Sequence, residues 1–430
     1  MTKLLKNLQQ LLRQNKKQII LVLTIAIAIA IVTPALTQQR VTVTILMRAS
    51  EAVQWKPFIA EFEQKNPHIH LEIIEAPTAT NQVEDLYTSS FLLGNSPYDL
   101  IYMDIIWVSK FAAAGWLLPL DNRLSSQELA EFLPGDIDGG TYQGQLYRMP
   151  FLTNGGMLYY RQDLLEEGGY QPPETFEELV RISQDLQKEG KVEWGYIWQG
   201  KQYEGLSAMF VEILQGFGAF WLDPDTGEVG LDRPAAIEGV KFLRSTLEKG
   251  ISPPGVTTYA EEETRRLFQN GRAVFLRNWP YVFALASQDD SSIQGKFAIK
   301  PMVHAPGYGS GACLGGWGLG ISSSSKHPDE AWKIIEFMTG EDIQRRYVLQ
   351  TGTAPTRRKL YREPAIVSKY PHYPQLLEVV ENSALRPPIT QYAQASDILQ
   401  RYLSAALTDR MSAKQAMEAA ARETRFLLKK

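Results

Sequence analysis

The alternation of strand and helix patterns near the start of the chain constrains its fold most. Residues 41–47 alternate in hydrophobicity like a strand, residues 53–65 place apolar side chains at helical spacing, and residues 69–75 have a strand pattern again. A helical pattern over 82–93 and a short apolar strand over 99–103 follow. Successive β-α-β units build parallel sheets with helices on their faces. We therefore predict an α/β fold whose first part is a parallel sheet wrapped by helices.

The same pattern restarts after Pro150. A strand is predicted over 157–160, and Thr175 with Glu178 fits the capping box that begins a helix. A later helix begins with a proline and ends before a glycine, over 328–340. We find neither a repeat nor a Pro/Ser-rich linker in the sequence. This organisation favours two lobes joined by several short crossings over domains strung on linkers.

Nothing in the cysteine and histidine content predicts a metal site or a cofactor. Cys313 is the only cysteine, which excludes an intrachain disulfide and a Cys-based zinc site. His68 and His70 are two residues apart, but a metal needs more ligands, so we expect a plain surface strand there. Residues 223–227 resemble the start of a calcium loop, yet they lack its later ligands. We expect a turn at that position.

The charge of the chain argues against a nucleic-acid partner. Residues 1–37 hold five basic residues and no acidic one, so the rest of the chain has a net charge of -9. An acidic body repels a phosphate backbone, and no basic face with interleaved aromatic residues is apparent. We therefore predict no nucleic-acid binding.

The N-terminus is typical of an exported protein. Lys16 and Lys17 precede an apolar run over 19–32, and Pro34 and small residues follow it. A basic start, an apolar middle and small residues at the end form a signal peptide, which we assign to residues 1–37. The run also approaches the length of a membrane span, so an uncleaved anchor is the alternative. Both interpretations place the body outside the cytoplasm, in the periplasm or its equivalent.

A glycine-rich stretch over 309–320 is the most unusual local composition. It has neither the dinucleotide fingerprint nor the Lys-Ser/Thr of a phosphate loop, so it does not predict nucleotide binding. At its centre, Gly315 and Gly316 precede Trp317. Missing side chains let backbone amides and an indole face approach a ligand. The alternative is a tight turn with a tryptophan in the core.

The aromatic and acidic residues fit carbohydrate chemistry. Sugar rings stack their C–H faces on indoles, and their hydroxyls need dense polar partners, which Trp279 and Trp317 could share with nearby carboxylates. Glu51 follows the first predicted strand and Asp104 ends the third, so both fall at the carboxyl edge of the sheet, where ligands bind in α/β folds. Two carboxylates are also what a glycosidase requires. The sequence leaves a binding site and a glycosidase open.

Ordered sequence blocks carry a resemblance to a known family. The chain from about Val41 onward resembles the extracellular solute-binding proteins of ATP-driven sugar importers, and most closely their trehalose/maltose-binding branch. The blocks are residues 51–56 and 59–63, 102–104 with Trp107, 155–165, 198–205, 277–281, 314–317 and 386–387.

The resemblance implies a two-lobed periplasmic-binding-protein type II fold with the ligand in the cleft between the lobes. Residues 38–150 with about 302–350 would form one lobe, and residues 151–301 with about 351–430 the other. In the cleft, carboxylates would accept hydrogen bonds, tryptophans would stack, glycines would offer backbone groups and an arginine would donate. The residues to which these roles transfer are Glu51, Asp104, Asn154, Tyr203, Glu204, Trp279, Gly315, Gly316, Trp317 and Arg386.

The chain departs from that branch at one informative place. Where the family usually has an aromatic residue and an aspartate two residues apart, this sequence has Leu152 and Asn154. An asparagine both donates and accepts, whereas an aspartate only accepts, so a different hydroxyl pattern is expected here. Sucrose or a glucosyl-polyol therefore competes with trehalose and maltose as the predicted ligand.

From the sequence we predict a monomeric, non-enzymatic binding protein. It would capture an α-linked disaccharide or small glucoside and deliver it to the transmembrane subunits of an ABC permease. One alternative is a secreted glycosidase that uses Glu51 and Asp104. A second is a membrane-anchored receptor subunit that signals, which requires the N-terminal segment to stay attached.

Overall fold

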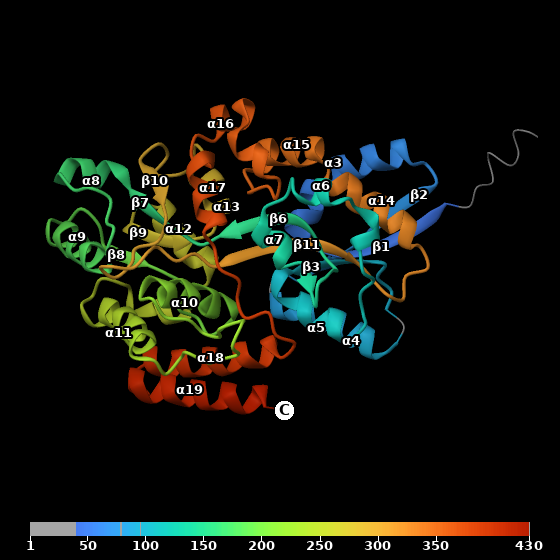
Figure 1. Cartoon of the computed structure of the whole chain (residues 1–430). Helices are drawn as coiled ribbons and strands as arrows, with labels where there is room; N and C mark the ends of the chain where they lie inside the picture. The colour runs from blue at the N-terminus through green and yellow to red at the C-terminus, as the bar shows by residue number, and fades with distance from the viewer. Residues whose placement is uncertain (1–39, 78–79, 95, 430) are drawn as a thin grey trace, which may run out of the picture.

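The chain forms two lobes, each built on its own sheet, which lie side by side in Figure 1. The computed structural model describes residues 40–77, 80–94 and 96–429. The predicted signal peptide or anchor, residues 1–37, lies outside these described residues. Within the described part of the chain, none of the helices has both the length and the apolar character that crossing a bilayer requires.

The first lobe contains a five-stranded sheet in the order β2-β1-β3-β11-β6. β1 runs parallel to β2 and β3, as predicted, whereas β11 runs antiparallel to both of its neighbours. The sheet is therefore mixed, and its centre includes a strand from late in the sequence. The strands are β1 (Val41–Arg48), β2 (Ile69–Ala76), β3 (Leu100–Asp104), β6 (Met149–Gly155) and β11 (Leu314–Ile321).

Helices cover the faces of this first sheet. Trp55 on α3 is fully buried and stacks on Tyr347 of α15, with ring centroids 4.7 Å apart. α3 begins at Ala49, four residues before the predicted start. The sequence did not indicate this start, because the N-cap residue is Arg48 and not a Ser, Thr, Asp or Asn. The helical elements are α3 (Ala49–Lys65), α4 (Thr80–Leu92), η1 (Ile105–Trp107), α5 (Val108–Ala113), η2 (Asp121–Arg123), α6 (Ser126–Leu129), α7 (Pro134–Asp138), α14 (Pro328–Thr339) and α15 (Glu341–Thr351); β4 (Thr141–Tyr142) and β5 (Gln145–Leu146) form a small hairpin.

The second lobe has a four-stranded sheet in the order β10-β7-β9-β8. The predicted capping box is confirmed, since the Thr175 hydroxyl accepts from the Glu178 amide at the start of α9. The strands are β7 (Met157–Arg161), β8 (Trp194–Ile197), β9 (Ala273–Asn278) and β10 (Phe297–Lys300). The helical elements are α8 (Gln162–Gly168), α9 (Phe176–Lys188), α10 (Glu204–Gly216), α11 (Pro234–Glu248), η3 (Pro254–Thr258), α12 (Glu261–Gln269), α13 (Tyr281–Ala286), η4 (Arg358–Arg362), α16 (Pro364–Lys369), α17 (Tyr373–Glu381), α18 (Tyr392–Leu407) and α19 (Ala413–Leu428).

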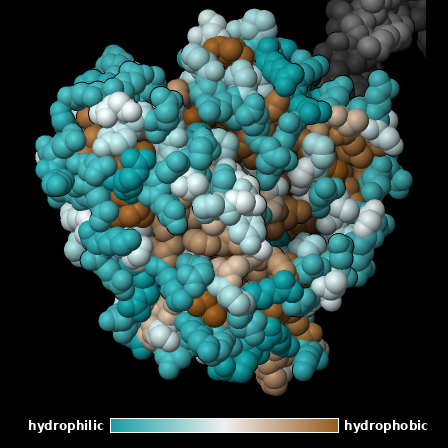
Figure 2. All heavy atoms as spheres, turned by 60° about the vertical axis from the view of Figure 1, so that its left-hand side comes forward, coloured by the Kyte–Doolittle hydropathy of each residue, from teal (hydrophilic) through white to brown (hydrophobic). Residues whose placement is uncertain are grey.

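The chain passes between the two sheets more than once. β6 extends past the boundary predicted after Pro150 and pairs with β11, so the chain leaves the first sheet after Gly155 and enters β7 at Met157. It returns between β10 and β11. Seen with the second lobe turned forward, the surface is mostly hydrophilic, with a hydrophobic area across its middle and smaller hydrophobic patches elsewhere (Figure 2).

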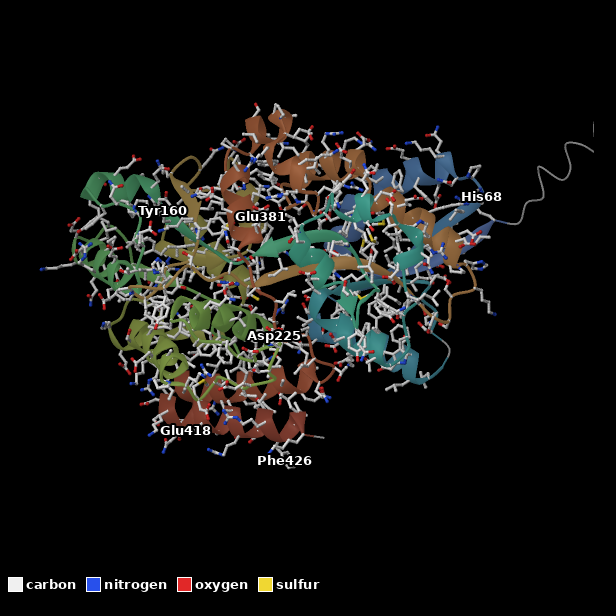
Figure 3. The ribbon with its side chains drawn as sticks, viewed as in Figure 1. His68, Tyr160, Asp225, Glu381, Glu418 and Phe426 are labelled. Atoms are coloured by element: carbon white, nitrogen blue, oxygen red, sulfur yellow. The ribbon has the colours of Figure 1, made fainter. Side chains whose placement is uncertain are left out.

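The two features weighed as metal ligands have structural roles. Residues 223–227 form the predicted turn, in which Asp223 Oδ1 accepts from the Asp225 and Thr226 amides at 3.0 and 2.8 Å (Asp225 is labelled in Figure 3). His68 lies in the turn before β2, at the outer end of the first lobe, and His70 Nδ1 lies 2.7 Å from Glu63 Oε1 (Figure 3). Among residues 40–77, 80–94 and 96–429, no group of three or more His, Cys, Asp or Glu side chains is arranged to hold a metal ion.

Candidate functional site

Two of the predicted carboxylates lie at the carboxyl edge of the first sheet. Asp104 ends β3, and its Oδ1 accepts from the Ile106 amide at 3.3 Å, which caps η1. Glu51 lies in the first turn of α3, and its Oε2 accepts from Arg48 Nε at 3.0 Å. Both carboxylate residues are 8% exposed. Glu51, just after β1, and Asp104, at the end of β3, thus lie at the same edge of the sheet. Ligands bind at this edge in α/β folds.

Arg386 connects this edge to the second lobe. Its Nη1 donates to Glu204 Oε1 at 2.7 Å, and its Nη2 donates to Asp104 Oδ1 at 3.3 Å. Glu204 begins α10 and also accepts from the Tyr392 hydroxyl and, at 2.6 Å, from Ser396 Oγ. Arg386 is only 6% exposed. A buried charge is stable only when opposite charges and hydrogen bonds surround it. The Arg386 guanidinium meets this need by binding one carboxylate from each lobe.

Trp317 on β11 packs on protein groups at the same edge. Its ring stacks on Tyr102 with centroids 4.8 Å apart and meets the edge of Trp107 at 5.4 Å. The Arg48 guanidinium carbon lies 4.2 Å from the Trp317 ring centroid. Trp317 is 5% exposed. The sequence predicted that Trp317 stacks on a sugar ring. That role remains a prediction, because Tyr102, Trp107 and Arg48 already cover much of the Trp317 ring.

Gly315 brings together two other predicted residues. It pairs with Asn154 across β6 and β11. A Cβ atom on Gly315 would lie 3.5 Å from Asn154 Cβ and 3.5 Å from Cζ3 of the half-buried Trp279. Trp279 follows β9 of the second lobe. The missing side chain therefore lets an indole of one lobe approach the sheet of the other.

A buried ion pair between Arg277 and Glu212 packs against the Trp279 ring. The Arg277 guanidinium carbon lies 4.1 Å from the Trp279 ring centroid. Arg277 Nε donates to Glu212 Oε2 at 2.7 Å, and Nη1 donates to Gln199 Oε1 at 3.0 Å. The side chains of Arg277 and Glu212 are completely buried. Burial raises the pKa of Glu212, and the adjacent guanidinium opposes that shift.

Tyr203 and Glu261 border Trp279 on the second lobe. Trp279 Nε1 donates to Glu261 Oε1 at 3.3 Å. Burial, together with the negative charge of Glu261, raises the pKa of the Tyr203 hydroxyl. Tyr203 precedes α10, and its ring covers Gly205, where a Cβ atom would lie 2.2 Å from Tyr203 Oη. Tyr203 and Trp279 thus belong to one aromatic and acidic cluster.

Gly316 has a backbone role. Its φ is +154°, and a Cβ there would lie 2.6 Å from the carbonyl oxygen of Leu152. Side-chain residues rarely adopt this conformation, so glycine is required for the sheet itself. Leu152 is buried, while Asn154 is half-buried beside Gly315.

The sequence interpretation missed several residues of this region. Arg48 contacts both Glu51 and Trp317, and the three-residue spacing from Arg48 to Glu51 was the available signal. Glu212 had no signal, because its partner Arg277 lies 65 residues away. Tyr392 had none either, because its partner Glu204 is 188 residues away.

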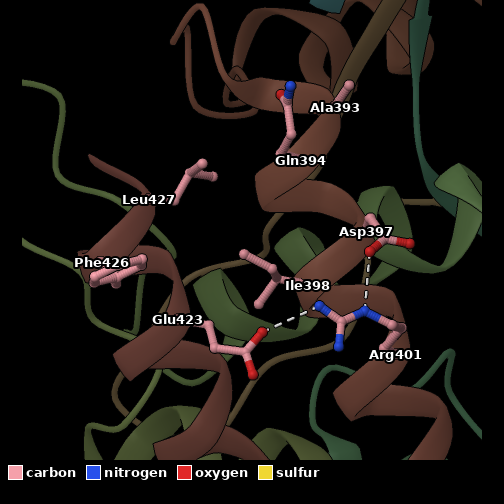
Figure 4. A pocket seen from close by; sticks show the side chains of 8 residues that line it. All are labelled: Ala393, Gln394, Asp397, Ile398, Arg401, Glu423, Phe426 and Leu427. Carbon is pink, nitrogen blue, oxygen red and sulfur yellow. Dashed lines mark hydrogen bonds and ion pairs between the residues drawn. The ribbon is translucent and has the colours of Figure 1, made fainter. Parts of the chain in front are cut away.

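Two hollows accompany these residues. A groove of about 580 Å³ runs between α18 and α19, where Arg401 bonds to Asp397 and Glu423 (Figure 4). It contains none of the predicted site residues. A much smaller cavity of about 60 Å³ lies between α4 and η1 of the first lobe and α10 and α18 of the second, and it includes Glu204.

Two sheet-based lobes with charged and aromatic side chains facing each other define a solute-binding protein. Comparison of the sequence with family models confirms that the chain belongs to the bacterial extracellular solute-binding proteins, with residues 48–345 matched. Relatives of the chain include a probable ABC transporter-binding protein and proteins named for binding maltotriose or mannitol. The predicted family and the two-lobed fold are confirmed.

Individual relatives agree with this assignment. The chain is 31% identical over 346 residues to a probable ABC transporter-binding protein of Deinococcus radiodurans, covering 79% of this chain and 82% of the relative. A mannitol-binding protein of Pseudomonas aeruginosa is 24% identical over 91% of this chain and 94% of its own length. The maltose-bound MalE3 of T. maritima superposes with a TM-score of 0.84 at 38% identity, covering 90% of this chain and 99% of that structure.

Proposed function

We propose that this protein captures an α-linked disaccharide or a small glucoside of the trehalose, maltose, sucrose or glucosylglycerol class. The ligand would lie between the two lobes, and the protein would deliver it to the permease of an ABC importer. It would work as a monomer in the periplasm or an equivalent compartment, exported by the N-terminal segment as a signal peptide or held by it as an anchor. The lobes would comprise residues 38–150 with about 302–350, and 151–301 with about 351–430, except that β6 keeps residues 151–155 with the first lobe.

The observation that carries the proposal is the meeting of Trp279 and Gly315 from opposite lobes. An indole beside a strand that lacks a side chain offers an apolar surface for the C–H face of a sugar ring. Asn154 beside Gly315 offers both a donor and an acceptor to hydroxyls. The similarity to a maltose-bound structure at 38% identity supports a disaccharide.

Polar groups on the other side of the cleft fit the same ligand class. Glu51 and Asp104 would accept hydrogen bonds from sugar hydroxyls, and Arg386 would donate to ring or hydroxyl oxygens. In the structure, Arg386 bonds to Asp104 of the first lobe and to Glu204 of the second. A ligand that binds these groups would therefore contact both lobes and favour the closed arrangement.

The relative with mannitol in its name supports a polyol as the second candidate. It shares 24% identity with this chain over nearly its full length. A linear polyol has hydroxyls but no ring face to stack. The two candidates therefore differ in their need for the Trp279 indole.

A thermal-shift panel tests the proposal. It should include maltose, trehalose, sucrose and mannitol, with an amino acid and a dipeptide as negative controls. A ligand at about 100 times its dissociation constant stabilises the folded state by about 2.7 kcal/mol. Chromatography of the incubated sugars distinguishes stoichiometric binding from glycosidase turnover. A shift with the amino acid or dipeptide alone, or the appearance of hydrolysis products, would contradict the proposal.

A further inference from the structure

Two segments that cross between the lobes are bonded to each other. Gly156 joins β6 to β7, and Cys313 lies just before β11. The Gly156 amide donates to the Cys313 carbonyl oxygen at 3.3 Å. Leu314, the next residue, pairs with Gly155 across β11 and β6. The two crossings therefore form one hydrogen-bonded junction between the lobes.

Helix α10 of the second lobe is attached to this junction by two side chains. Glu212 Oε1 accepts from the Cys313 amide at 3.4 Å, and Gln215 Oε1 accepts from the Ala312 amide at 3.1 Å. The fit at Gly156 is tight, because a Cβ atom there would lie 1.7 Å from Glu212 Oε1. The Glu212 carboxylate is thus in contact with both crossings.

The same carboxylate holds the residue that packs against Trp279. Arg277 binds Glu212 through both Nε and Nη2, and Nε lies 2.7 Å from Glu212 Oε2. The Arg277 guanidinium carbon lies 4.1 Å from the Trp279 ring centroid. The side chains of Arg277 and Glu212 are completely buried, so moving one of them would leave the other as an unpaired buried charge. This requirement holds the two side chains in one arrangement.

A continuous series of contacts therefore connects two parts of the proposed sugar site. The Trp279 ring packs on Arg277, and Arg277 is bound to Glu212. Glu212 in turn binds the Cys313 amide, which lies two residues before Gly315. Trp279 belongs to the second lobe and Gly315 to the first, and the carboxylate lies between them in this series. A shift of the carboxylate would move the indole relative to β11.

We propose that Glu212 is a positioning residue for sugar binding, which holds the Trp279 indole against β11 through Arg277 and the Cys313 amide. The proposal rests on the sugar-binding function proposed above. The Glu212 side chain is completely buried and would not touch the sugar. Its effect on affinity should therefore depend on the presence of the Trp279 ring. A contribution to stability alone would not depend on that ring.

A double-mutant cycle tests this dependence. Glu212→Asp keeps the negative charge that Arg277 needs, but its side chain is one methylene shorter. The carboxylate then cannot reach Arg277 and the Cys313 amide as it does in the wild type. The matched control is Gln215→Met on the same helix, which loses the bond to the neighbouring Ala312 amide and leaves the Glu212–Arg277 pair intact.

Both substitutions are also combined with Trp279→Ala. The proteins are titrated calorimetrically with whichever of maltose, trehalose and sucrose the wild type binds most tightly, and high sugar concentrations extend the titration to the weakly binding variants. The unliganded proteins are compared by near-ultraviolet circular dichroism. The difference spectrum between each protein and its Trp279→Ala counterpart reports the surroundings of this one indole.

We expect Glu212→Asp to lower the affinity about threefold or more when Trp279 is present, and by less than about twofold in the Trp279→Ala background, because residues of one network are not additive. Gln215→Met should change the affinity by the same factor in both backgrounds, since independent sites are additive within about twofold. The Trp279 difference spectrum should change in Glu212→Asp and stay as in the wild type in Gln215→Met.

Thermal melts establish which proteins are folded at the temperature of the titration. If Glu212→Asp does not fold, Arg277→Lys takes its place in the cycle. A lysine keeps the positive charge, but it lacks the planar fork that binds both carboxylate oxygens and packs on the indole. The same dependence on Trp279 is expected for this variant.

The positioning role is overturned if Glu212→Asp changes the affinity by the same factor with and without the Trp279 ring. An unchanged Trp279 difference spectrum in Glu212→Asp, or an equal dependence on Trp279 in Gln215→Met, would overturn it as well. In these cases the wild type still binds a disaccharide, so the proposed function stands. If none of the sugars binds to the wild type, the proposed function itself fails, and the positioning role fails with it.

Discussion

Trp279 from the second lobe lies 3.5 Å from the position that a Cβ atom of Gly315 would occupy on the first lobe. This distance is an ordinary van der Waals contact, so the fold tolerates a methyl group there. The same methyl group would touch the Trp279 indole and Asn154, beside the place where we propose that the sugar binds. A substitution at Gly315 should therefore affect ligand binding more than it affects folding.

Gly315→Ala and Gly316→Ala should have opposite consequences. Gly315→Ala is expected to lower sugar affinity about tenfold or more while the melting temperature of the unliganded protein stays close to that of the wild type. Gly316→Ala should instead lower the melting temperature, because its φ of +154° and the Leu152 carbonyl oxygen at 2.6 Å disfavour a Cβ. Calorimetric titration and thermal melts of both variants measure the two effects. A stability loss for Gly315→Ala with intact affinity would refute this assignment.

The two tryptophans should also differ. Trp279 is half-buried, so Trp279→Ala is expected to weaken sugar binding by about 1–3 kcal/mol with a small change in melting temperature. Trp317 packs on Tyr102 and Arg48, so Trp317→Ala should lower the melting temperature as well as the affinity. Phe at either position should cost less than Ala, since a ring face remains. Equal affinity for sugar in wild type and Trp279→Ala would exclude Trp279 from the site.

Arg386→Lys tests the connection between the lobes. An ammonium group does not reproduce the fork that reaches Glu204 and Asp104, so we expect a loss of about 1–3 kcal/mol in the free energy of unfolding and weaker sugar binding. The matched control is Arg401→Lys on the outer side of α18, whose ion pairs are exposed and worth about 0–1 kcal/mol. Denaturant unfolding measures both variants. A similar small effect in both would show that the Arg386 bridge is unimportant.

The sequence predicted the local elements of the fold better than the arrangement of the sheets. Hydrophobic patterns located β1, β2 and β3, and the Thr175 capping box located the start of α9. The insertion of β11 between β3 and β6 was not predictable, because its glycine-rich sequence lacks a strand pattern and its partners lie about 160 to 220 residues earlier. Such pairing is decided by tertiary packing.

In the site, too, residues that depend on local elements were predictable, and residues that depend on distant partners were not. Glu51 and Asp104 were placed by the rule that strand ends meet at one sheet edge, which needs only local elements. Arg386 and Glu204 are 182 residues apart, and only the family resemblance pointed to them. Arg48 was missed because a charged residue at the end of a strand is usually solvated, whereas here Trp317 and Glu51 cover it.

His372 should make the protein sensitive to acid. It is buried, stacks on Phe283 with ring centroids 3.4 Å apart, and neither of its ring nitrogens has a hydrogen-bond partner. Burial lowers the pKa of His372 to about 3, whereas an unfolded histidine titrates near pH 6.5. Below pH 6.5 the unfolded chain binds this proton and the folded chain does not, so the free energy of unfolding falls as the pH drops toward 3.

At pH 5 this effect should reach about 2 kcal/mol relative to pH 7.5. Urea unfolding of the wild type and of His372→Phe at both pH values isolates it, since the variant should lose less stability on acidification by that amount. His68→Phe serves as the control at the outer end of the first lobe. Identical pH dependence in the wild type and His372→Phe would mean that His372 does not remain neutral in the folded protein.

Calorimetric titration of the wild-type protein with maltose, trehalose, sucrose and mannitol, followed by analysis of the recovered ligand, tests the central claim most directly. We predict one saturable site per chain for at least one α-linked disaccharide, with the sugar recovered intact and with weaker binding of mannitol, which has no ring face for Trp279. Binding of mannitol alone would replace the disaccharide with a polyol. The account would be contradicted if none of the four ligands bound, or if the disaccharide were recovered as monosaccharides.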